Sequence, residues 1–352
     1  MDQLKAITKL PNIAKVVGMP DLHPGTGYPI GAAFFSTQRF YPALIGGDIG
    51  CGMAFWQTDI TIAKLHLNKL EKRLGSIDLP LDEEIIEANL PEQLRQNQFV
   101  SSLGTIGLGN HFAEFQQVDT LYEAEITDQL GLNKKALQLL VHSGSRGFGG
   151  TIGRSHVDQF GHHGLDDDTE YAQAYLTQQQ LALEYATLNR QLIAQRILSK
   201  VKATGVPLLD LFHNFIEQKQ IEGMNGWLHR KGAAPADKGL AIIPGSRGDY
   251  SYLVQPIATK DSLYSLAHGA GRKWIRTDCK GRLKNHYTVD QLTRSHFNSR
   301  FICDNRELIY EEAPQAYKSI ETVIDSLVQA KIIKVLARLK PVLTYKTLKE
   351  KI

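Results

Sequence analysis

The amino-acid sequence predicts an α+β fold: a single compact domain spanning residues 1–352, with a central β-sheet core and surrounding helices. Two observations predict it. One long segment has apolar residues at helical spacing, and several short apolar segments of strand length lie between glycine-rich loops. These helices and strands follow one another irregularly, which favours an α+β fold over a regular βαβ array. The chain has no internal repeat and no low-complexity linker, so the sequence gives no reason to divide it further.

The longest predicted helix begins after Asp166, Asp167 and Asp168, because acidic side chains suit a helix N-terminus by capping and by the helix dipole. Its apolar stripe consists of Tyr171, Leu176, Leu181, Leu183, Tyr185, Leu188, Leu192, Ile193 and Ile197. Gly205 and Pro207 follow its expected end. A second helix is predicted over residues 319–339, ending before Pro341.

Three short strands are predicted, over residues 136–142, 240–243 and 250–254, each next to a glycine loop. The sequence has no GxxxxGK[ST] loop and no clear strand–GxGxxG–helix unit. The common phosphate-binding folds are therefore not indicated.

Composition indicates an ordinary globular protein, with 42% hydrophobic and 22% charged residues. No apolar stretch is long enough to span a bilayer, and residues 1–18 lack the apolar core of a signal peptide. We therefore expect a cytoplasmic protein with no membrane partner. The three cysteines are expected to be free thiols, with Cys279 and Cys303 as small buried residues.

The formal charge of +3 is unevenly distributed. Residues 261–300 contain eight lysines and arginines against three acids, and residues 331–352 contain seven against one. A basic C-terminal third is typical of a protein that presents a positive surface to a polyanion such as a nucleic acid. Solvated helix faces would give the same count.

Five residues of types that commonly bind metals stand in or beside glycine-rich loops. The loop at residues 46–52 (GGDIGCG) brings the Asp48 carboxylate close to the Cys51 thiol, and His111, His142 and His213 follow in later loops. Together they could hold two divalent metals with the thiolate as a bridge, which suits phosphoryl chemistry. Taken singly, each histidine is more often a hydrogen-bonded structural residue, and the spacing does not match a zinc finger.

Two further segments could bind a nucleotide. The glycine–serine loop at residues 244–251 (PGSRGDYS) could hold a phosphate through its backbone N–H groups and hydroxyls, or could be an ordinary tight turn. His268 stands among small residues that leave room for a bulky adduct. Arg272 and Lys273 follow it and could neutralise phosphate.

At these residues the sequence resembles the RtcB family of RNA ligases. The matching blocks occur in order along the whole chain: MPDLHPG (19–25), GGDIGCGM (46–53), GNHFAE (109–114), HSGSRGFG (142–149), HN (213–214), HRKGA (229–233), PGSRGDYSYLV (244–254) and HGAGR (268–272).

The resemblance implies a single RtcB-type domain with a buried two-metal pocket. The family joins RNA ends bearing a 3′-phosphate or 2′,3′-cyclic phosphate to a 5′-hydroxyl, using GTP and two Mn²⁺ ions. By resemblance, Asp48, Cys51 and His111 hold one ion. Cys51, His142 and His213 hold the other, with Cys51 as the bridge. Since thiolate and imidazole ligands hold Zn²⁺ more tightly than Mn²⁺, we expect Zn²⁺ to displace Mn²⁺ and inhibit.

The resemblance also assigns the nucleotide chemistry. His268 matches the histidine that attacks the α-phosphorus of GTP and carries the guanylate to the RNA 3′-phosphate. The residues expected at the nucleotide are Asn110, His111, Phe112, Ala113, Glu114, His213, Asn214, Pro244, Gly245, Ser246, Arg247, Ser251, His268, Gly269, Ala270, Gly271 and Lys346. Of these, Asn110, Glu114, Asn214, Ser246 and Ser251 would contact guanine and ribose. On charge, Arg146, Arg230, Lys231 and Arg272 are candidates for the RNA phosphates.

The sequence departs from the family pattern at several places. Arg247 stands where the family usually has a methionine, and Asp249 where it has a small hydroxyl residue. Residues 23–25 and Leu108 also differ, and the first motif lies unusually close to the first residue. The departures leave the metal set intact and bear on the choice of RNA and nucleotide. They are typical of a divergent branch that serves RNA repair, including repair of ribosomal RNA, rather than tRNA splicing.

Two other functions remain as alternatives. A metal-dependent phosphoesterase that opens cyclic phosphates without ligating is suggested by Arg247 and Asp249. An RNA-binding accessory protein with a relic site is a third reading. Guanylate labelling separates the ligase from the phosphoesterase, and metal content separates both from the accessory protein. An activating accessory protein is a further candidate partner of the ligase.

Overall fold

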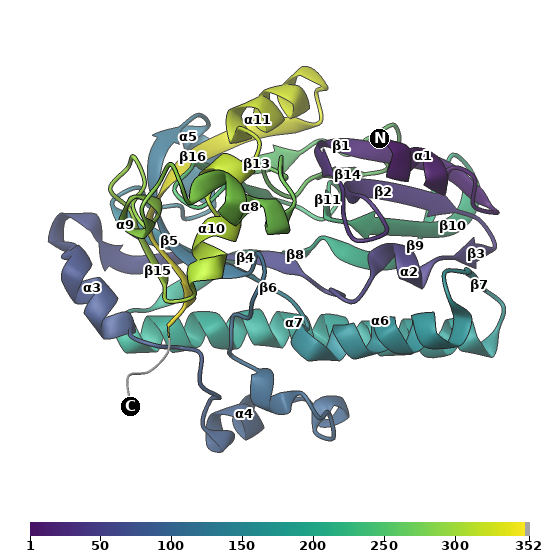
Figure 1. Cartoon of the computed structure of the whole chain (residues 1–352), viewed down its shortest axis with the longest axis horizontal. Coiled ribbons are helices and arrows are strands. Elements are labelled where there is room, and N and C mark those ends of the chain that lie inside the picture. Colours follow the sequence, from purple (N-terminus) through teal and green to yellow (C-terminus); the bar gives the residue numbers. More distant parts are fainter. Residues whose placement is uncertain (349–352) are drawn as a thin grey trace.

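Two β-sheets form the centre of the computed structural model, which describes residues 1–348 (Figure 1). The predicted α+β fold with a central sheet is confirmed. The last four residues of the basic segment 331–352 lie outside the described part of the chain. Among the described residues, no helix is both long enough and apolar enough to cross a membrane.

The larger sheet contains most of the strands that approach the candidate site. Its order is β12 (Ala241–Pro244), β13 (Ser251–Pro256), β16 (Ile333–Thr347), β5 (Phe112–Leu121), β6 (Ala136–Ser143), β4 (Gly52–Thr61) and β8 (Gly205–Phe212). These neighbours pair antiparallel, and β15 (Arg300–Cys303) adds a parallel pairing with β16. The three strands predicted from sequence are confirmed as β6, β12 and β13, within about two residues at each end.

The smaller sheet has the antiparallel order β1 (Ile13–His23), β2 (Ile30–Ser36), β10 (Met224–Lys231) and β9 (Asn214–Ile221). Two short pairs complete the strands: β11 (Ala233–Pro235) with β14 (Ser265–Ala267), and β3 (Arg39–Phe40) with β7 (Leu165–Asp166). Because β8 leads directly into β9, the chain passes from one sheet to the other at His213. That residue therefore lies where the two sheets meet.

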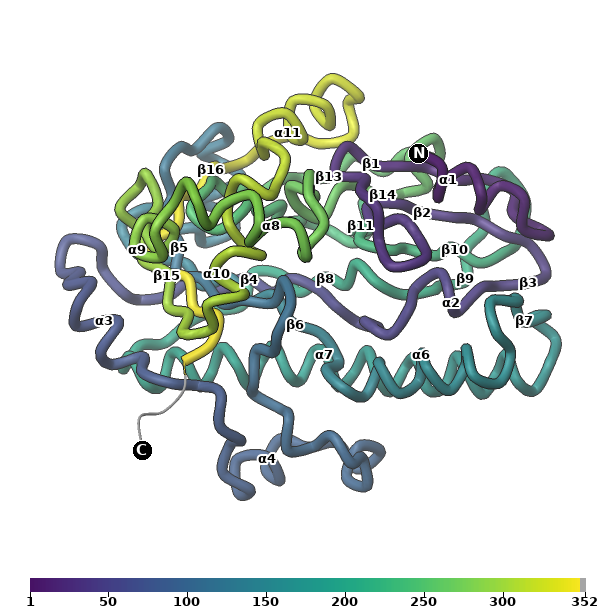
Figure 2. The backbone as a smooth tube through the Cα atoms, viewed as in Figure 1, coloured from purple at the N-terminus to yellow at the C-terminus, as the bar shows by residue number. Residues whose placement is uncertain are grey.

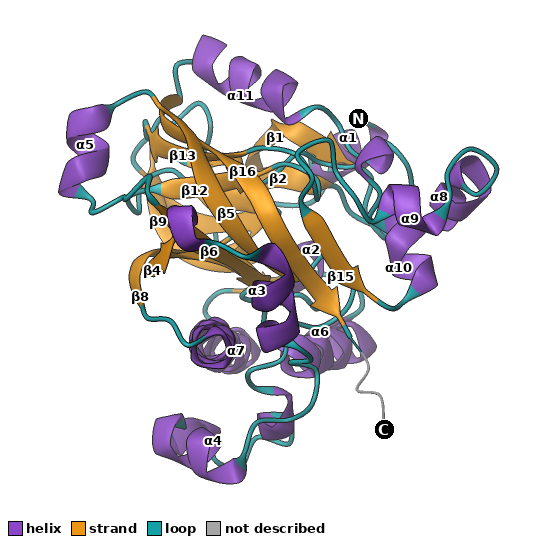
Figure 3. Cartoon of the chain, turned by 90° about the vertical axis from the view of Figure 1, so that its left-hand side faces the viewer, coloured by secondary structure: helices purple, strands orange, loops and turns teal. Residues whose placement is uncertain are grey.

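Helices cover the outside of the sheets (Figure 3). Their bounds are α1 (Asp2–Ile7), α2 (Pro42–Ile45), α3 (Leu67–Leu74), α4 (Glu83–Asn89), α5 (Ala124–Gln129), α6 (Arg146–Phe160), α7 (Glu170–Val201), α8 (Arg276–Leu283), α9 (Val289–Leu292), α10 (Arg306–Glu311) and α11 (Ile320–Gln329). Helices α6 and α7 run beneath the sheets, and the segment containing α4 hangs below them (Figures 1 and 2). Helices α8, α9 and α10 form a small group beside β15, called here the α8–α10 lobe (residues 276–311).

The long helix predicted from sequence is confirmed as α7. Its residues Ile193 and Ile197 pack against Leu139 and Val141 of β6 in one apolar cluster. Burying each such side chain stabilises the fold by roughly 1.5–3 kcal/mol. The predicted acidic cap is wrong: Thr169 is the N-cap, and its hydroxyl accepts from the Ala172 N–H.

The three aspartates before α7 include two that bind elsewhere. Asp166 pairs with Arg39, and Asp167 accepts from the Trp227 indole N–H at 2.8 Å. A carboxylate at a helix start thus forms tertiary contacts when a side-chain partner is within reach that binds it more strongly than the helix backbone N–H groups do.

The second predicted helix, residues 319–339, is wrong in its second half. Helix α11 ends at Gln329, and the chain then enters β16, the longest strand. Lys331, with φ of 57°, makes the turn without a glycine to signal it. The β-branched residues Ile332, Ile333 and Val335 favour a strand. Pro341 lies inside β16 at an irregularity in its pairing with β5, where the missing N–H is tolerated.

Candidate metal and nucleotide site

A cavity of about 490 Å³ opens between the two sheets and the start of the α8–α10 lobe. Its wall includes residues from both halves of the chain, from His23 to Lys346. Such a volume is suited to a small-molecule ligand. It is called here the main cavity.

One end of the main cavity is formed by a cluster of metal-binding side chains. Cys51 Sγ lies 3.3 Å from His111 Nε2 and 3.1 Å from His142 Nε2. The three ligand atoms all lie within 4.8 Å of one another, and all three residues are buried. Asp48 is partly exposed, and its Oδ1 lies 3.7 Å from His111 Nε2. The His213 ring packs on His142 with centroids 5.2 Å apart.

Neighbouring strands bring these distant residues together. In the sheet register, Gly52 of β4 stands opposite Ser143 of β6 on one side and Phe212 of β8 on the other. Phe112 of β5 stands opposite His142. Cys51, His111, His142 and His213 therefore occupy the ends of four adjacent strands, which explains why their irregular spacing in sequence is compatible with one site.

Helix α7 fixes the loop that holds Asp48 and Cys51. The buried Arg190 guanidinium donates to the carbonyls of Gly50 and Ser143, both at 2.9 Å. The opposite side of the same group pairs with Asp210. Since breaking a buried pair leaves an unpaired charge, this contact should hold the loop firmly.

The cluster is tuned toward neutral imidazoles beside a carboxylate. Burial lowers the pKa of His142 and of His213 well below the usual value. Burial would raise the pKa of Asp48, but the neighbouring His111 outweighs it and holds that pKa low. Burial, followed by the nearby Asp48, raises the pKa of the Cys51 thiol. A neutral imidazole keeps the lone pair that a metal ligand needs.

The donor set fits a divalent cation. The His142 Nδ1–H donates to the Asn110 carbonyl at 3.2 Å, which leaves the Nε2 lone pair directed toward Cys51. His111 Nδ1 is buried and has no hydrogen-bond partner within the described residues. The thiol, the imidazoles and the nearby carboxylate are all ligand types that bind divalent transition metals.

His268 lies next to this cluster and is oriented by a carboxylate. Its ring packs on His213 with centroids 4.7 Å apart. The Asp21 carboxylate is fully buried and accepts from His268 Nδ1 at 2.7 Å and from its backbone N–H at 3.2 Å. Because a carboxylate accepts, Nδ1 carries the proton and Nε2 is left with a free lone pair.

Two glycines permit this arrangement. Gly271 has φ of 70°, and a Cβ there would stand 2.1 Å from the Asp21 carbonyl oxygen. Gly232 has φ of 60°, and its Cβ would stand 3.0 Å from His268 Cε1. Any side chain at these positions would displace the Asp21–His268 pair.

Glu114 is a buried carboxylate on the wall of the main cavity. It accepts from Gln116 at 2.7 Å and from the Thr344 hydroxyl, and Gln116 also donates to Ser251 at 2.7 Å. Burial raises the pKa of Glu114 to about 7, although these hydrogen bonds oppose the shift. Both oxygens of Glu114 can therefore act as acceptors toward a ligand only when the group is ionised.

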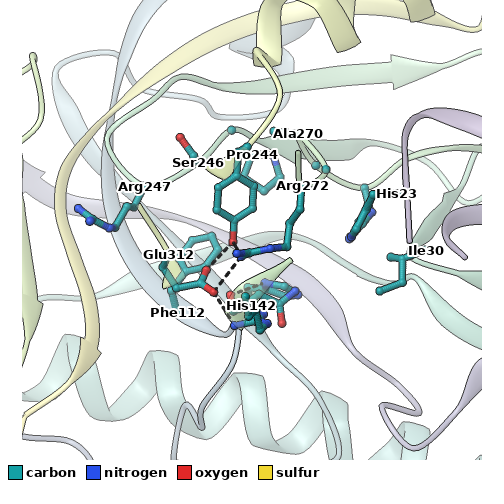
Figure 4. A pocket seen from close by; sticks show the side chains of 18 of the residues that line it. His23, Ile30, Phe112, His142, Pro244, Ser246, Arg247, Ala270, Arg272 and Glu312 are labelled. Atoms are coloured by element: carbon teal, nitrogen blue, oxygen red, sulfur yellow. Dashed lines mark hydrogen bonds and ion pairs between the residues drawn. The ribbon is translucent and has the colours of Figure 1, made fainter. Parts of the chain in front are cut away.

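Cations line the remaining wall of the main cavity. Lys346 is buried and donates to the His111 carbonyl at 2.6 Å, and burial lowers its pKa to about 8. Arg272 donates to the Tyr317 hydroxyl at 2.9 Å, and Tyr317 in turn donates to Glu312 at 2.5 Å (Figure 4). Arg276 pairs with the same glutamate at 2.6 Å. The wall can thus neutralise an anion while its own charges stay paired.

Comparison with known proteins matches the chain along its length. The family model described as tRNA-splicing ligase RtcB matches residues 3–85 and 82–347. The chain belongs to the RtcB family. An RNA-splicing ligase RtcB2 from Escherichia coli is 57% identical over 98% of the chain and 91% of that protein. A tRNA-splicing ligase RtcB from Nanoarchaeum equitans is 30% identical, with the same two coverages. An RNA-splicing ligase RtcB from Mycobacterium tuberculosis is 27% identical over 96% of the chain and 98% of that protein.

Most residues expected from the RtcB resemblance line the main cavity. They are Asp48, Asn110, Phe112, Glu114, His142, His213, Asn214, Pro244, Gly245, Ser246, Arg247, His268, Gly269, Ala270, Gly271 and Lys346. Cys51 and His111 lie behind this wall within the buried cluster.

Besides His111, two residues expected at the nucleotide do not line the cavity. The Ala113 methyl group packs into the apolar core with Phe115 and Tyr345, because side chains alternate between the faces of β5. Ser251 is buried and accepts from Gln116, so it supports Glu114 from behind.

Two of the four cations expected at RNA phosphates are also placed elsewhere. Arg230 is fully buried and paired with Glu217, so it does not reach the cavity. Arg146 packs over Gly107 and is absent from the cavity wall. Lys231 and Arg272 do line it. Charge along the sequence cannot separate a buried ion pair from a free cation, which explains the error.

The two departures from the RtcB pattern point away from the cavity centre. The Arg247 side chain extends away from the other labelled residues (Figure 4). Its guanidinium donates to the Leu292 carbonyl and, at 3.0 Å, to the Ile309 carbonyl, in the last turns of α9 and α10. It also stacks over Phe301 at 4.2 Å. Asp249 accepts from its neighbour Tyr250 N–H, and burial raises its pKa to about 6. Arg247 therefore ties the nucleotide loop to the α8–α10 lobe.

Sequence reasoning missed Asp21, Glu312, Tyr317 and Arg276. Asp21 lies in a matched block. The signal that could have found it is the pattern PDLHPG at residues 20–25, which places this aspartate two residues before His23. Glu312, Tyr317 and Arg276 come from segments without a motif, and only their common position on the cavity wall reveals them.

Proposed function

We propose that the chain is a GTP-dependent RNA ligase that joins an RNA 3′-phosphate or 2′,3′-cyclic phosphate end to a 5′-hydroxyl end. The ligase domain comprises residues 1–352 and acts in the cytoplasm, in RNA repair or tRNA splicing. The observation that carries the proposal is the Asp21–His268 pair, which lies beside a buried Cys/His cluster at the wall of a nucleotide-sized cavity. Family membership supports it.

In the first step, His268 Nε2 attacks the α-phosphorus of GTP. A P–N bond forms, the bond to the departing pyrophosphate breaks, and the histidine carries GMP. Asp21 keeps the proton on Nδ1 and stabilises the positive charge that develops on the ring. Lys346 and Arg272 lie on the same wall and offset the phosphate charge.

In the later steps, an oxygen of the RNA 3′-phosphate displaces the histidine and takes up GMP. The RNA 5′-hydroxyl then attacks the activated phosphorus, and GMP leaves with the electron pair of the broken P–O bond. A cyclic phosphate end requires prior opening by water. Transfer of GMP to the 3′-phosphate gives that phosphorus a good leaving group in place of a poor one, which is the purpose of the covalent intermediate.

The metal ligands in this proposal are Asp48, Cys51 and His111 for one Mn²⁺ ion and Cys51, His142 and His213 for a second. Bound Mn²⁺ would supply Lewis-acid neutralisation of phosphate charge. The contacts of Cys51 with His111 and His142 at similar distances support its membership of both sets. Arg190 holds its loop in position from α7.

The guanine is recognised in this proposal by Glu114, whose carboxylate would accept from the N–H groups along one edge of the base. Asn110, Asn214 and Ser246 are the further candidates for polar contacts, since all three line the cavity. Thr344 orients the carboxylate by donating to it, and Ser251 acts indirectly by accepting from Gln116, which also donates to Glu114. Lys231 and Arg272 are the candidates that remain for RNA phosphate.

The test is incubation of the purified protein with α-labelled GTP and Mn²⁺. Wild type should acquire an acid-labile label, as expected for a P–N bond, and His268→Ala should acquire none. His286→Ala, which removes an exposed histidine of the α8–α10 lobe, is the matched control and should label like wild type. Labelling of His268→Ala would overturn the assignment of the nucleophile.

Absence of label on wild type would overturn the ligase proposal and favour the phosphoesterase. The two residues that suggested hydrolysis, Arg247 and Asp249, contact the lobe and a neighbouring backbone N–H, so their contacts do not favour it. Hydrolysis of a 2′,3′-cyclic phosphate RNA end, followed without GTP, would then be the decisive measurement.

A further inference from the structure

A second cavity, of about 520 Å³, lies between α6, the N-terminal part of α7 and the segment before β5. Its wall consists of Gln96, Asn97, Gln98, Phe99, Phe148, Thr151, Ile152, Ser155, His156, Gln159, Phe160, Leu165, Tyr171, Ala174, Tyr175 and Gln178. None of these residues lines the main cavity. Its volume is within the range of small-molecule sites.

Two polar atoms in this wall are buried without a partner among the described residues. They are His156 Nε2 and the Tyr175 hydroxyl, whose residues are 5% and 6% exposed. Leaving such a group unpaired costs about 1–3 kcal/mol. A ligand that supplies a hydrogen bond to each would recover that free energy.

The wall is also rich in aromatic rings. The His156 ring lies 5.3 Å from Phe160 and 5.6 Å from Tyr175, measured between centroids. Phe99 and Phe148 form a stacked pair with centroids 6.3 Å apart, and Tyr171, 58% exposed, packs edge-on against Phe160. Flat heterocycles bind between such rings by stacking.

No residue of the wall carries a charge. The polar members are amides and hydroxyls, and burial lowers the pKa of His156, so its imidazole is neutral at cellular pH. Such a site selects against phosphate and against metal cations, because neither would find a counter-charge. It favours a neutral ligand with hydrogen-bonding edges.

We propose that the second cavity binds an unpaired nucleobase, stacked on its aromatic wall and hydrogen-bonded to His156 and Tyr175. An apolar peptide side chain could fill the space but would leave both polar atoms unpaired. A nucleobase supplies a flat ring and donors and acceptors along its edge together. It could come from an RNA strand or from a free nucleoside.

Helix α6 connects the second cavity to the loop at residues 46–52, which holds Asp48 and Cys51. One side of α6 lies against that loop, since a Cβ at Gly153 would stand 2.9 Å from Gly47 Cα. Phe148, Ile152 and His156 of the same helix line the second cavity. Starting next to β6, α6 reaches His156 after about 15 Å. An RNA bound in the second cavity would be held in a fixed orientation relative to the main cavity. This consequence rests on the proposed function.

The test uses 2-aminopurine riboside, whose fluorescence falls when the base stacks, and an RNA strand that carries one unpaired 2-aminopurine. Ala174→Trp fills the rim of the cavity from an exposed helix position. Gln173→Trp places the same side chain at the adjacent exposed position outside the wall and is the matched control. Both variants keep the main cavity, so their difference reports on the second cavity alone.

We expect saturable quenching with wild type and Gln173→Trp, and affinity about tenfold or more weaker for Ala174→Trp. Tyr175→Phe should weaken binding by about three- to tenfold without lowering the melting temperature, because the hydroxyl has no partner to lose. Quenching by the free nucleoside identifies a nucleoside site, and quenching only in the strand identifies an RNA site. Equal affinities of Ala174→Trp and Gln173→Trp, or no saturable quenching with either probe, would overturn the proposal. None of these readouts requires guanylylation, so they are independent of the ligase proposal.

Discussion

At the scale of single residues, the site depends on a few protons held at defined atoms. Asp21 keeps the proton on His268 Nδ1, and the Asn110 carbonyl keeps it on His142 Nδ1. In both rings the Nε2 lone pair is thereby left available, for attack at His268 and for a metal at His142 in the proposed function. Hydrogen bonding to a fixed acceptor sets the tautomer more securely than pKa alone.

Asp21→Asn tests this at His268. The substitution keeps the shape of a fully buried side chain but removes the charge that stabilises the protonated ring. We expect the rate of guanylate labelling to fall by roughly 10–100-fold, as for other positioning residues. The single-turnover rate of labelling measures it, and GTP affinity should change little. An unchanged rate would mean that Asp21 does not position the nucleophile.

Glu114 gives a pH dependence. Its pKa is raised to about 7, so the ionised fraction falls as the pH falls through neutrality. Because protonation turns one acceptor oxygen into a donor that faces the guanine N–H groups, the Kd for GTP should rise toward low pH, by up to about tenfold per pH unit below the pKa. Titration calorimetry between about pH 6 and pH 8 measures this. In Glu114→Gln the affinity should be weak and nearly independent of pH; a slope like that of wild type would assign the titration to another group.

At the scale of secondary-structure elements, the site forms because the ends of neighbouring strands lie side by side. Four strand ends, of β4, β5, β6 and β8, bring the metal-binding side chains together, and α7 fixes the loop beneath them through Arg190. The α8–α10 lobe forms one side of the main cavity and is attached to the nucleotide loop through Arg247. Within the basic segment 261–300, Arg272 and Arg276 pair with Glu312 and so act partly as structural contacts.

Arg247→Met tests the attachment of the lobe. It removes two charge-assisted hydrogen bonds to helix-terminal carbonyls and should destabilise the protein by about 1–3 kcal/mol, measured as a lower urea midpoint. GTP affinity should change less than twofold, because the guanidinium donates away from the cavity. Lys284→Met, an exposed cation of the same lobe, is the control and should have no effect on stability. A large loss of GTP affinity without a loss of stability would place Arg247 at the nucleotide instead.

At the scale of the whole molecule, the proposed metal ligands come from positions between residue 48 and residue 213 and meet only in the folded chain, so metal binding should be coupled to the folded state. Metal that binds only the folded chain raises its stability in proportion to the logarithm of metal concentration. The donor set also determines which metal is preferred. A thiolate and imidazoles favour Zn²⁺ over Mn²⁺.

We therefore expect Zn²⁺ to displace Mn²⁺ and to inhibit guanylate labelling, and chelation to lower the melting temperature. Bound metal after dialysis against equal concentrations of both ions, measured by mass spectrometry, should be mostly zinc. Cys51→Ser replaces the soft ligand by oxygen and should reduce this preference. Ligation sustained by Zn²⁺ alone would contradict the expected inhibition.

The sequence predicted the elements whose signals are local. Helix α7 follows from its apolar stripe, and β6, β12 and β13 from short apolar segments. The sequence-based prediction failed for β16. After α11 the chain turns at Lys331 and becomes a strand because it pairs with β5 and β13, which lie far away in the sequence. The prediction failed likewise at the start of α7, where Thr169 caps the helix while Asp166 and Asp167 bind distant side chains.

By itself, the sequence determined the RtcB family, and it proposed the metal ligands and the nucleophilic histidine, because these depend on motifs that remain contiguous along the chain. Only the tertiary structure decided which cations face the main cavity, which carboxylate orients His268, and that Arg247 contacts the lobe. The second cavity also appears only in three dimensions. Burial and pairing depend on contacts between distant segments, and a charge or a hydroxyl has the same letter whether it is paired, free or left without a partner.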